Sequence, residues 1–163
     1  LTHTVATLGT ALTAEHVQAL RRFAERIVLL FDPDAAGVRA ALRGLDLFVN
    51  SGLSVKVVTL PAGEDPDTFI RKAGADAFAQ LEAGAPSLLD YALNYTIDQA
   101  DPGSLESRIR SVDEVLRILQ RSEHPIERQE RMRVVAERLR ISERLNRSQV
   151  LSHRAYNSHR GFL

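Results

Sequence analysis

Apolar residues in the first half of the chain follow two different spacings. Short apolar runs at residues 4–8 (TVATL), 27–31 (IVLLF) and 54–60 (SVKVVTL) are typical of buried strands. Between these runs, apolar residues recur three and four positions apart over residues 14–25 and 35–49, as on one face of a helix. Strands that alternate with helices indicate βαβ units, so we predict an α/β fold with a mostly parallel sheet of about three strands flanked by helices.

The second half of the chain has the helical spacing throughout. After a loop with the sequence PAGEDPD, we expect helices over residues 68–72, 75–82, 87–98, 105–119, 126–139 and 142–156. Thr13 is a candidate N-cap for the first helix of the chain, and the sequence DPGS at residues 101–104 is a typical helix start. The change of pattern predicts an α/β domain over residues 1–85 and an all-α domain over residues 86–163.

Composition limits the classes of site that this chain can carry. Among 163 residues, 44% are apolar, which is enough for a packed core, and none is cysteine. Zinc sites built from thiolates are therefore excluded, and we expect no zinc in this chain. No apolar stretch approaches the roughly 20 residues that a membrane-spanning helix needs, and no leader pattern is present, so we expect a cytoplasmic protein without membrane contact.

The net charge of zero hides a difference between the two parts of the chain. Residues 1–100 hold 8 basic and 12 acidic residues (8 − 12 = −4), and residues 101–163 hold 13 and 9 (13 − 9 = +4). The basic surplus includes Arg128, Arg131, Arg133, Arg138, Arg140, Arg144 and Arg147. Arginines that alternate with glutamates usually form a solvated, ion-paired helix face, and the competing interpretation is weak, salt-sensitive DNA binding.

Two aspartates follow the second apolar run, in the sequence IVLLFDPDAAG. Residues two apart in an extended chain point the same way, so Asp32 and Asp34 can direct their carboxylates at one spot. Like charges at that distance favour a bound cation. Gly37 then lies at the start of the expected helix, where backbone can approach an anionic ligand closely. The alternative is that one of the aspartates only caps this helix.

A second acidic cluster follows the next expected strand. It consists of Glu64, Asp65 and Asp67, and in a parallel sheet it lies at the same edge as the first pair. Asp67 is also a candidate N-cap for the helix that follows. Carboxylates that converge on Mg²⁺ or Mn²⁺ suit phosphate chemistry, but this pattern does not separate nucleotidyl transfer, hydrolysis and strand passage. The chain has no Walker-type loop, no Gly-x-Ser-x-Gly motif and no cysteine nucleophile.

Three blocks of sequence resemble the second part of the Toprim catalytic domain of DnaG-type bacterial DNA primases. They are ATLGTALTAEHVQAL, IVLLFDPDAAGVRAALRGL and VVTLPAGEDPDTFIRKAG, in the family's order and spacing. The stretch from Pro86 to about Leu151 is similar to the small helical subdomain of the primase RNA polymerase core. Other Toprim proteins share only the Asp-x-Asp-x-x-Gly pattern. The block GEDPD and the helical segment that follows it favour a primase over these other Toprim proteins.

The resemblance implies synthesis of short RNA primers on a single-stranded DNA template from ribonucleoside triphosphates. It implies that Asp32 and Asp34 are catalytic and that two or more Mg²⁺ or Mn²⁺ ions are held by Asp32, Asp34, Asp65 and Asp67. Gly9, Thr10 and Gly37 would line the nucleotide site. The replicative helicase would be a partner through a C-terminal domain that we expect to lie outside this chain.

One motif of the family is missing from the sequence. The family's first Toprim strand ends in a glutamate within Glu-Gly-x-x-Asp, and this chain contains no such motif. We therefore expect an incomplete sheet and a fragment that is inactive by itself. The alternatives are a Toprim nuclease or topoisomerase and a non-catalytic fragment that binds DNA or protein. A topoisomerase needs a tyrosine nucleophile, and the three tyrosines of the chain lie in helical patterns that are better explained by packing or surface exposure: Tyr91, Tyr95 and Tyr156.

Overall fold

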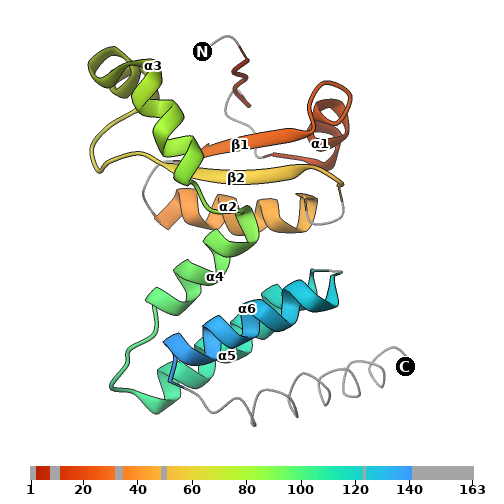
Figure 1. Cartoon of the computed structure of the whole chain (residues 1–163), viewed down its shortest axis with the longest axis vertical. Coiled ribbons are helices and arrows are strands. Elements are labelled where there is room, and N and C mark those ends of the chain that lie inside the picture. The colour runs from red at the N-terminus through yellow and green to blue at the C-terminus, as the bar shows by residue number, and fades with distance from the viewer. Residues whose placement is uncertain (1–2, 8–11, 32–34, 49–50, 123, 141–163) are drawn as a thin grey trace. The chain divides into compact units, whose positions relative to one another are not determined.

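The computed structural model describes residues 3–7, 12–31, 35–48, 51–122 and 124–140 (Figure 1). The elements of this part are α1 (Ala14–Leu20), β1 (Arg26–Phe31), α2 (Ala35–Phe48), β2 (Ser54–Thr59), α3 (Pro66–Gly84), α4 (Leu88–Asp98), α5 (Leu105–Gln120) and α6 (Pro125–Arg138). An α/β part followed by helices confirms the predicted fold class. The chain divides into two compact units, Leu1–Ala92 and Leu93–Leu163. The predicted domain boundary after residue 85 remains a prediction.

The sheet of the described part contains two parallel strands. Residues of β1 and β2 pair in register from Arg26 with Ser54 to Phe31 with Thr59. The strand predicted over residues 4–8 is wrong at residues 4–7, which are irregular, and Val5 is 80% exposed. A short apolar run becomes a strand only where a neighbouring strand pairs with it, and this pairing is a tertiary property.

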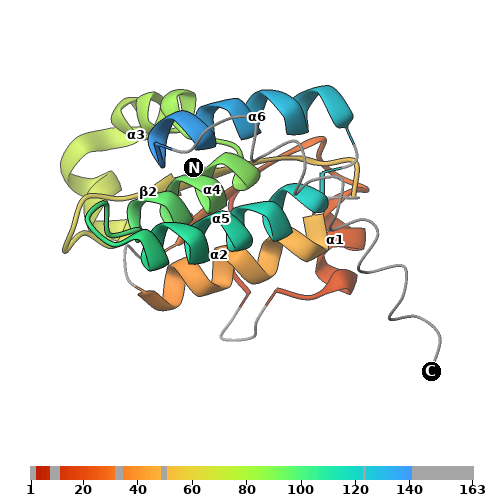
Figure 2. The same ribbon diagram turned by 90° about the horizontal axis from the view of Figure 1, so that it is seen from below.

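Helices cover both faces of the two strands in the first unit. Figures 1 and 2 show α2 and α3 on opposite sides of the sheet. On the α3 side, Val58 and Leu60 form a core cluster with Phe69, and partly buried Val28 and Leu30 of β1 pack against it. Because β2 is covered on both faces, its valines at positions 55, 57 and 58 are all buried, as in a strand inside a parallel sheet.

The first helix starts where the sequence predicts and ends earlier. Thr13 is the N-cap of α1, and its side chain accepts a hydrogen bond from the His16 N–H at 3.4 Å. The helix was expected to reach Glu25, but α1 ends at Leu20. The chain then turns, because the Phe23 N–H donates to the Leu20 carbonyl at 2.9 Å, and the Glu25 carbonyl accepts from the Ser54 N–H at 2.9 Å. Pairing with β2 therefore takes residue 25 out of the helix.

Helix α3 consists of two segments that meet at Gly74. Gly74 has φ 82° and ψ 173°, which lies outside the helical region and interrupts the helix. The two predicted helices over residues 68–72 and 75–82 correspond to these segments. Both contribute to one core, because Phe69 and Ile70 come from the first segment and Phe78 and Leu81 from the second.

The second unit is built from helices. Val115, Ile118 and Leu119 of α5 are 0–1% exposed, and Val135 and Ala136 are the least exposed core residues of α6. Ser104 caps α5 by accepting a hydrogen bond from the Ser107 N–H at 3.2 Å, as the sequence signal predicts. The helix expected over residues 142–156 lies outside the described residues. Within the described part, no helix has the length and apolar character needed to cross a membrane.

Candidate metal and nucleotide site

The two acidic segments begin at the same edge of the sheet. The last residues of β1 and β2, Phe31 and Thr59, are paired across the parallel strands. Asp32 follows Phe31 directly, and the loop that contains Glu64 and Asp65 begins after Thr59. In parallel sheets, ligands bind at this carboxyl edge, so the pairing brings the starts of both acidic connections together.

Four of the predicted site residues fall outside the part of the chain that the structure describes. They are Gly9, Thr10, Asp32 and Asp34. Gly37 lies in the first turn of α2, which starts at Ala35 as predicted. Asp65 and Asp67 are described. The predicted metal-binding role can therefore be compared with the structure only at Asp65 and Asp67.

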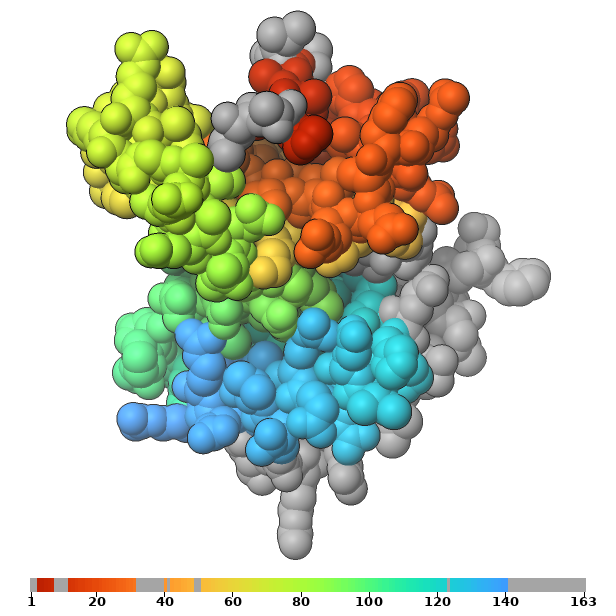
Figure 3. Space-filling model, turned by 45° about the horizontal axis from the view of Figure 1, so that its top comes forward, coloured from red at the N-terminus to blue at the C-terminus, as the bar shows by residue number. Residues whose placement is uncertain are grey.

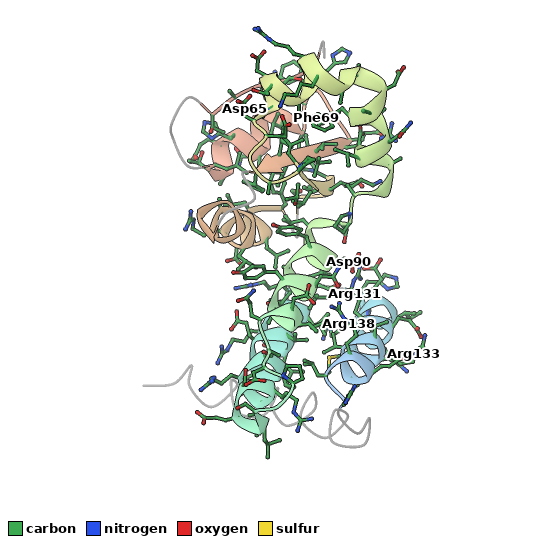
Figure 4. All side chains as sticks on the ribbon, turned by 90° about the vertical axis from the view of Figure 1, so that its left-hand side faces the viewer. Asp65, Phe69, Asp90, Arg131, Arg133 and Arg138 are labelled. Atoms are coloured by element: carbon green, nitrogen blue, oxygen red, sulfur yellow. The ribbon has the colours of Figure 1, made fainter. Side chains whose placement is uncertain are left out.

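Asp65 caps helix α3. Its Oδ1 accepts a hydrogen bond from the Thr68 N–H at 2.8 Å, and its Oδ2 accepts one from the Thr68 hydroxyl at 2.7 Å. The prediction that Asp67 is the N-cap is wrong, because Pro66 takes the first helical position and the helix starts two residues earlier. Figure 4 shows Asp65 close to Phe69 at this end of α3. The cap thus fixes the acidic segment above the buried Phe69.

The other two carboxylates of the cluster are paired with basic residues that the sequence interpretation did not include. Asp67 and Arg71 form an exposed ion pair at 2.9 Å, one helical turn apart. Glu64 Oε1 lies 2.8 Å from Lys72 Nζ, and the Glu64 side chain is 22% exposed. Glu64 Oε2 is buried and has no hydrogen-bond partner. Together with the Asp65 cap, these two ion pairs tie the acidic loop to the first segment of α3.

A metal site is not complete within the described residues. No group of three or more histidine or acidic side chains in this part of the chain is placed to hold an ion. Asp65 and Asp67 are only two of the four predicted ligands, and the other two belong to residues 32–34. The predicted set of Asp32, Asp34, Asp65 and Asp67 therefore stays a prediction.

The cap predicts a pH dependence of stability. Hydrogen bonds, first from the Thr68 N–H and then from its hydroxyl, hold the pKa of Asp65 below its ordinary value of 3.8. A carboxylate whose pKa is lower in the folded state adds stability above its unfolded pKa and loses it as the pH falls through the folded pKa. Asp65→Asn keeps a capping side chain but cannot titrate, so we expect its melting temperature to fall less than that of the wild type below pH 3.8.

Circular dichroism melts in acid measure this difference. Asp76→Asn removes an exposed carboxylate from the second segment of the same helix and is the matched control. An Asp65→Asn chain that loses stability in acid as steeply as the wild type would contradict the role of the cap.

Most of the arginines that the structure describes in the helical unit are held in ion pairs. Arg131 and Arg133 of α6 pair with glutamates at 3.0 and 3.5 Å, and Arg138 Nη2 lies 2.6 Å from Asp98 Oδ1 (Figure 4). Arg128 donates to the Ser122 carbonyl at 2.6 Å. Arg144 and Arg147 lie outside the described residues. In the described part, the ion-paired face that the sequence suggests is therefore the arrangement found.

Comparisons with known proteins match the α/β part and the helical part of the chain to two different family models. Residues 1–70 match the family model described as Toprim-like, and residues 89–144 match the model described as the DnaB-helicase binding domain of primase. A DNA primase of Clostridium acetobutylicum is 34% identical over 143 residues, which are 88% of this chain and 24% of the relative. The chain belongs to the DnaG-type bacterial primases. It spans between about a sixth and a quarter of the length of these curated primases.

Solved primase structures share this fold. The E. coli primase catalytic core has a TM-score of 0.69 and 31% identity, with 84% of this chain and 45% of the solved chain covered. A DnaG primase catalytic domain bound to single-stranded DNA has a TM-score of 0.69 and 30% identity, with 83% and 44% covered. The primase fold predicted from the three sequence blocks is therefore confirmed.

One expectation about partners differs from the comparisons. The resemblance implied that helicase binding belongs to a domain outside this chain, whereas the model with that description matches residues 89–144 of the chain itself. For the topoisomerase alternative, Tyr91 and Tyr95 lie partly buried in α4, and Tyr156 is outside the described residues. The relatives named above are primases, so the comparisons favour the primase interpretation.

Proposed function

We propose that this chain is part of the catalytic core with which the complete primase synthesises short RNA primers on single-stranded DNA. The reaction is nucleotidyl transfer from ribonucleoside triphosphates. The observation that supports it best is the parallel pairing of Phe31 with Thr59, because it starts both acidic connections at one edge of the sheet. The chain spans only part of its relatives, so we expect activity from the complete protein and none from this fragment alone.

Asp32 and Asp34 would hold two or more Mg²⁺ or Mn²⁺ ions, with Asp65 and Asp67 as further ligands. The donor set fits these hard ions, which prefer carboxylate oxygens. The buried and unpartnered Glu64 Oε2 beside this cluster fits a nearby cation as well, because a buried carboxylate oxygen without a partner is costly. Bound ions would neutralise phosphate oxygens during an in-line displacement.

The protein's own residues would position the acids and the nucleotide. The Asp65 cap and the Glu64–Lys72 pair hold the second acidic segment on α3. Gly9 and Thr10 would line the nucleotide site with backbone groups. Gly37, in the first turn of α2, leaves room for a phosphate near a helix N-terminus.

The helical part would contribute to contacts with the replicative helicase. This proposal rests on the match of residues 89–144 to the helicase-binding model. Single-stranded DNA would be the template, as a related catalytic domain is described as bound to it. A protein with these partners would work in the cytoplasm during DNA replication.

Asp34→Asn in the complete primase tests the proposal. We expect primer synthesis on a single-stranded template to fall about 100-fold or more, because a group that stabilises charge in the transition state is lost. Asp76→Asn, an exposed aspartate on α3 away from the acidic cluster, is expected to retain synthesis. Wild-type synthesis by Asp34→Asn would contradict the catalytic assignment.

A metal titration separates the binding claim from the catalytic claim. Calorimetric titration of this chain with Mn²⁺ is expected to show binding that weakens in Asp32→Ala and in Asp34→Ala. Equal affinity in the wild type and both variants would remove the metal site from the proposal.

A further inference from the structure

The turn between α1 and β1 carries an exposed aromatic residue among arginines. Its sequence from residue 21 to residue 26 is RRFAER, and Phe23 is 85% exposed. Arg21, Arg22 and Arg26 are exposed, and no ion pair links them to any residue of the described part. Most of the described arginines in the helical unit pair with acids, so this segment is different. We call residues 21–26 the RRF turn.

The RRF turn is held by backbone hydrogen bonds. The Arg22 N–H donates to the Ala19 carbonyl at 3.2 Å, and the Ala24 N–H donates to the Leu20 carbonyl at 3.0 Å. At the other end, the Glu25 carbonyl accepts from the Ser54 N–H at 2.9 Å. The turn is therefore anchored to α1 on one side and to β2 on the other. An exposed phenyl ring on an anchored backbone is a suitable platform for a flat ligand.

A hollow of about 310 Å³ adjoins the turn through Arg26. Its lining comes from the starts of the two strands and from the second segment of α3: Arg26, Ile27, Val28, Ser54, Lys56, Ala79, Glu82 and Ala83. The Lys56 ammonium lies on its wall and donates to the Glu82 and Ala83 carbonyls, each at 3.1 Å. The hollow thus adds a lysine and apolar surface next to the three arginines of the turn.

The charges of this region favour a phosphate-bearing partner. The turn has three arginines and one acid, Glu25, and the hollow adds Lys56 and Glu82. Guanidinium groups bind phosphate oxygens, and an exposed phenyl ring stacks on a nucleobase. Only a single strand offers unpaired bases for such stacking. Figure 3 shows the segment with α1 and the start of β1 (orange) on the surface of the first unit.

We propose that the RRF turn and the adjoining hollow bind single-stranded DNA, with Phe23 stacked on a base and the arginines on phosphates. The choice of DNA as the partner rests on the proposed function. The site is separate from the acidic edge, because Arg26 and Ser54 begin the strands that end at Phe31 and Thr59. Six strand residues span roughly 17–20 Å, so the nucleotides bound at the turn itself lie away from the acidic edge.

A tryptophan at position 23 tests stacking directly. The chain contains no tryptophan, so Phe23→Trp supplies a single fluorophore. We expect a short oligothymidylate to quench its emission in the presence of EDTA. Ile126→Trp, at a 69% exposed position on the arginine-rich α6, is the matched control and is expected to be quenched much less. Because EDTA removes divalent ions, the result does not depend on the proposed metal site.

Loss variants test the energetics of the same contact. By fluorescence anisotropy with a labelled oligothymidylate, we expect Phe23→Ala to bind about five-fold or more weakly. Arg21→Gln and Arg22→Gln are each expected to reduce the slope of log affinity against log salt by about 0.7. Arg133→Gln, which removes an arginine paired with Glu130, is the control and should leave affinity and slope unchanged. Phe23 is exposed, so its replacement should not unfold the chain.

Four results would overturn the proposal. They are no binding of oligothymidylate at low salt, unchanged binding by the Phe23 and arginine variants, equal quenching of the two tryptophans, and tighter binding of oligouridylate than of oligothymidylate. Failure of the proposed function would instead appear as unchanged primer synthesis in Asp34→Asn. The two failures are therefore distinguishable.

Discussion

Replacing Ile118 with alanine is expected to destabilise the helical unit by about 2–5 kcal/mol. Ile118 is 0% exposed and lies on α5 among other fully buried residues. The substitution removes three carbon atoms from a packed core and leaves a cavity that the neighbours fill only in part. A domain of this size has a total stability of roughly 5–15 kcal/mol, so the loss is a large fraction of it. Urea denaturation followed by circular dichroism measures the effect.

Ile109→Ala is the matched control for this prediction. Ile109 lies on the same helix and is 52% exposed, so the same atoms are removed without a buried cavity. We expect a loss of about 1 kcal/mol or less. Equal destabilisation by both substitutions would show that α5 does not bury the face seen in the structure.

Replacing Gly74 with alanine is expected to destabilise the first unit by about 1–3 kcal/mol. Gly74 has φ 82° and ψ 173°, a backbone conformation that a side chain with a Cβ rarely adopts. Backbone strain at Gly74 would also disturb the packing of the core. Phe69 and Phe78 lie on opposite sides of Gly74 and join the same core, so straightening the helix would break their packing. Thermal and urea denaturation of the chain measure the change.

Gly84→Ala at the end of the same helix controls for the loss of glycine itself. Gly84 has no positive φ, and an added Cβ would meet no atom within 4 Å. Alanine there is expected to be neutral or to stabilise by up to about 1 kcal/mol, because it restricts the unfolded chain. If Gly74→Ala proved as harmless as Gly84→Ala, the interruption of α3 would carry no energetic cost.

Local patterns in the sequence were sufficient for much of the fold. The apolar runs of β1 and β2, the Thr13 cap and the helix start after residues 101–104 are confirmed, as is the break of α3 near Gly74. These signals are local because apolar spacing, capping side chains and glycine act over a few residues. The sequence also identified which acids follow which strand, and the parallel pairing of Phe31 with Thr59 agrees with that order.

The incorrect predictions concern features that depend on distant residues. The helix predicted to reach Glu25 ends at Leu20, because the Glu25 carbonyl pairs with Ser54 of β2. Residues 4–7 have the composition of a strand, but no strand of the described part pairs with them. The incorrect Asp67 cap has a local cause instead. Both acids precede a helical pattern, and Pro66, which favours the first helical position, makes Asp65 the cap.

For this chain, the sequence by itself determined the order of strands and helices, the acidic residues at the strand ends and the membership in the primase family. Only the tertiary structure decided that Asp65 is the cap and that Glu64 and Lys72 pair. It also decided that most described arginines of the helical unit pair with acids, whereas those of the RRF turn form no ion pair with a described residue. The physical reason is the range of the interactions. Helix and strand patterns repeat over a few residues, whereas the partner of a charged side chain depends on which surfaces the folded chain brings within hydrogen-bonding distance.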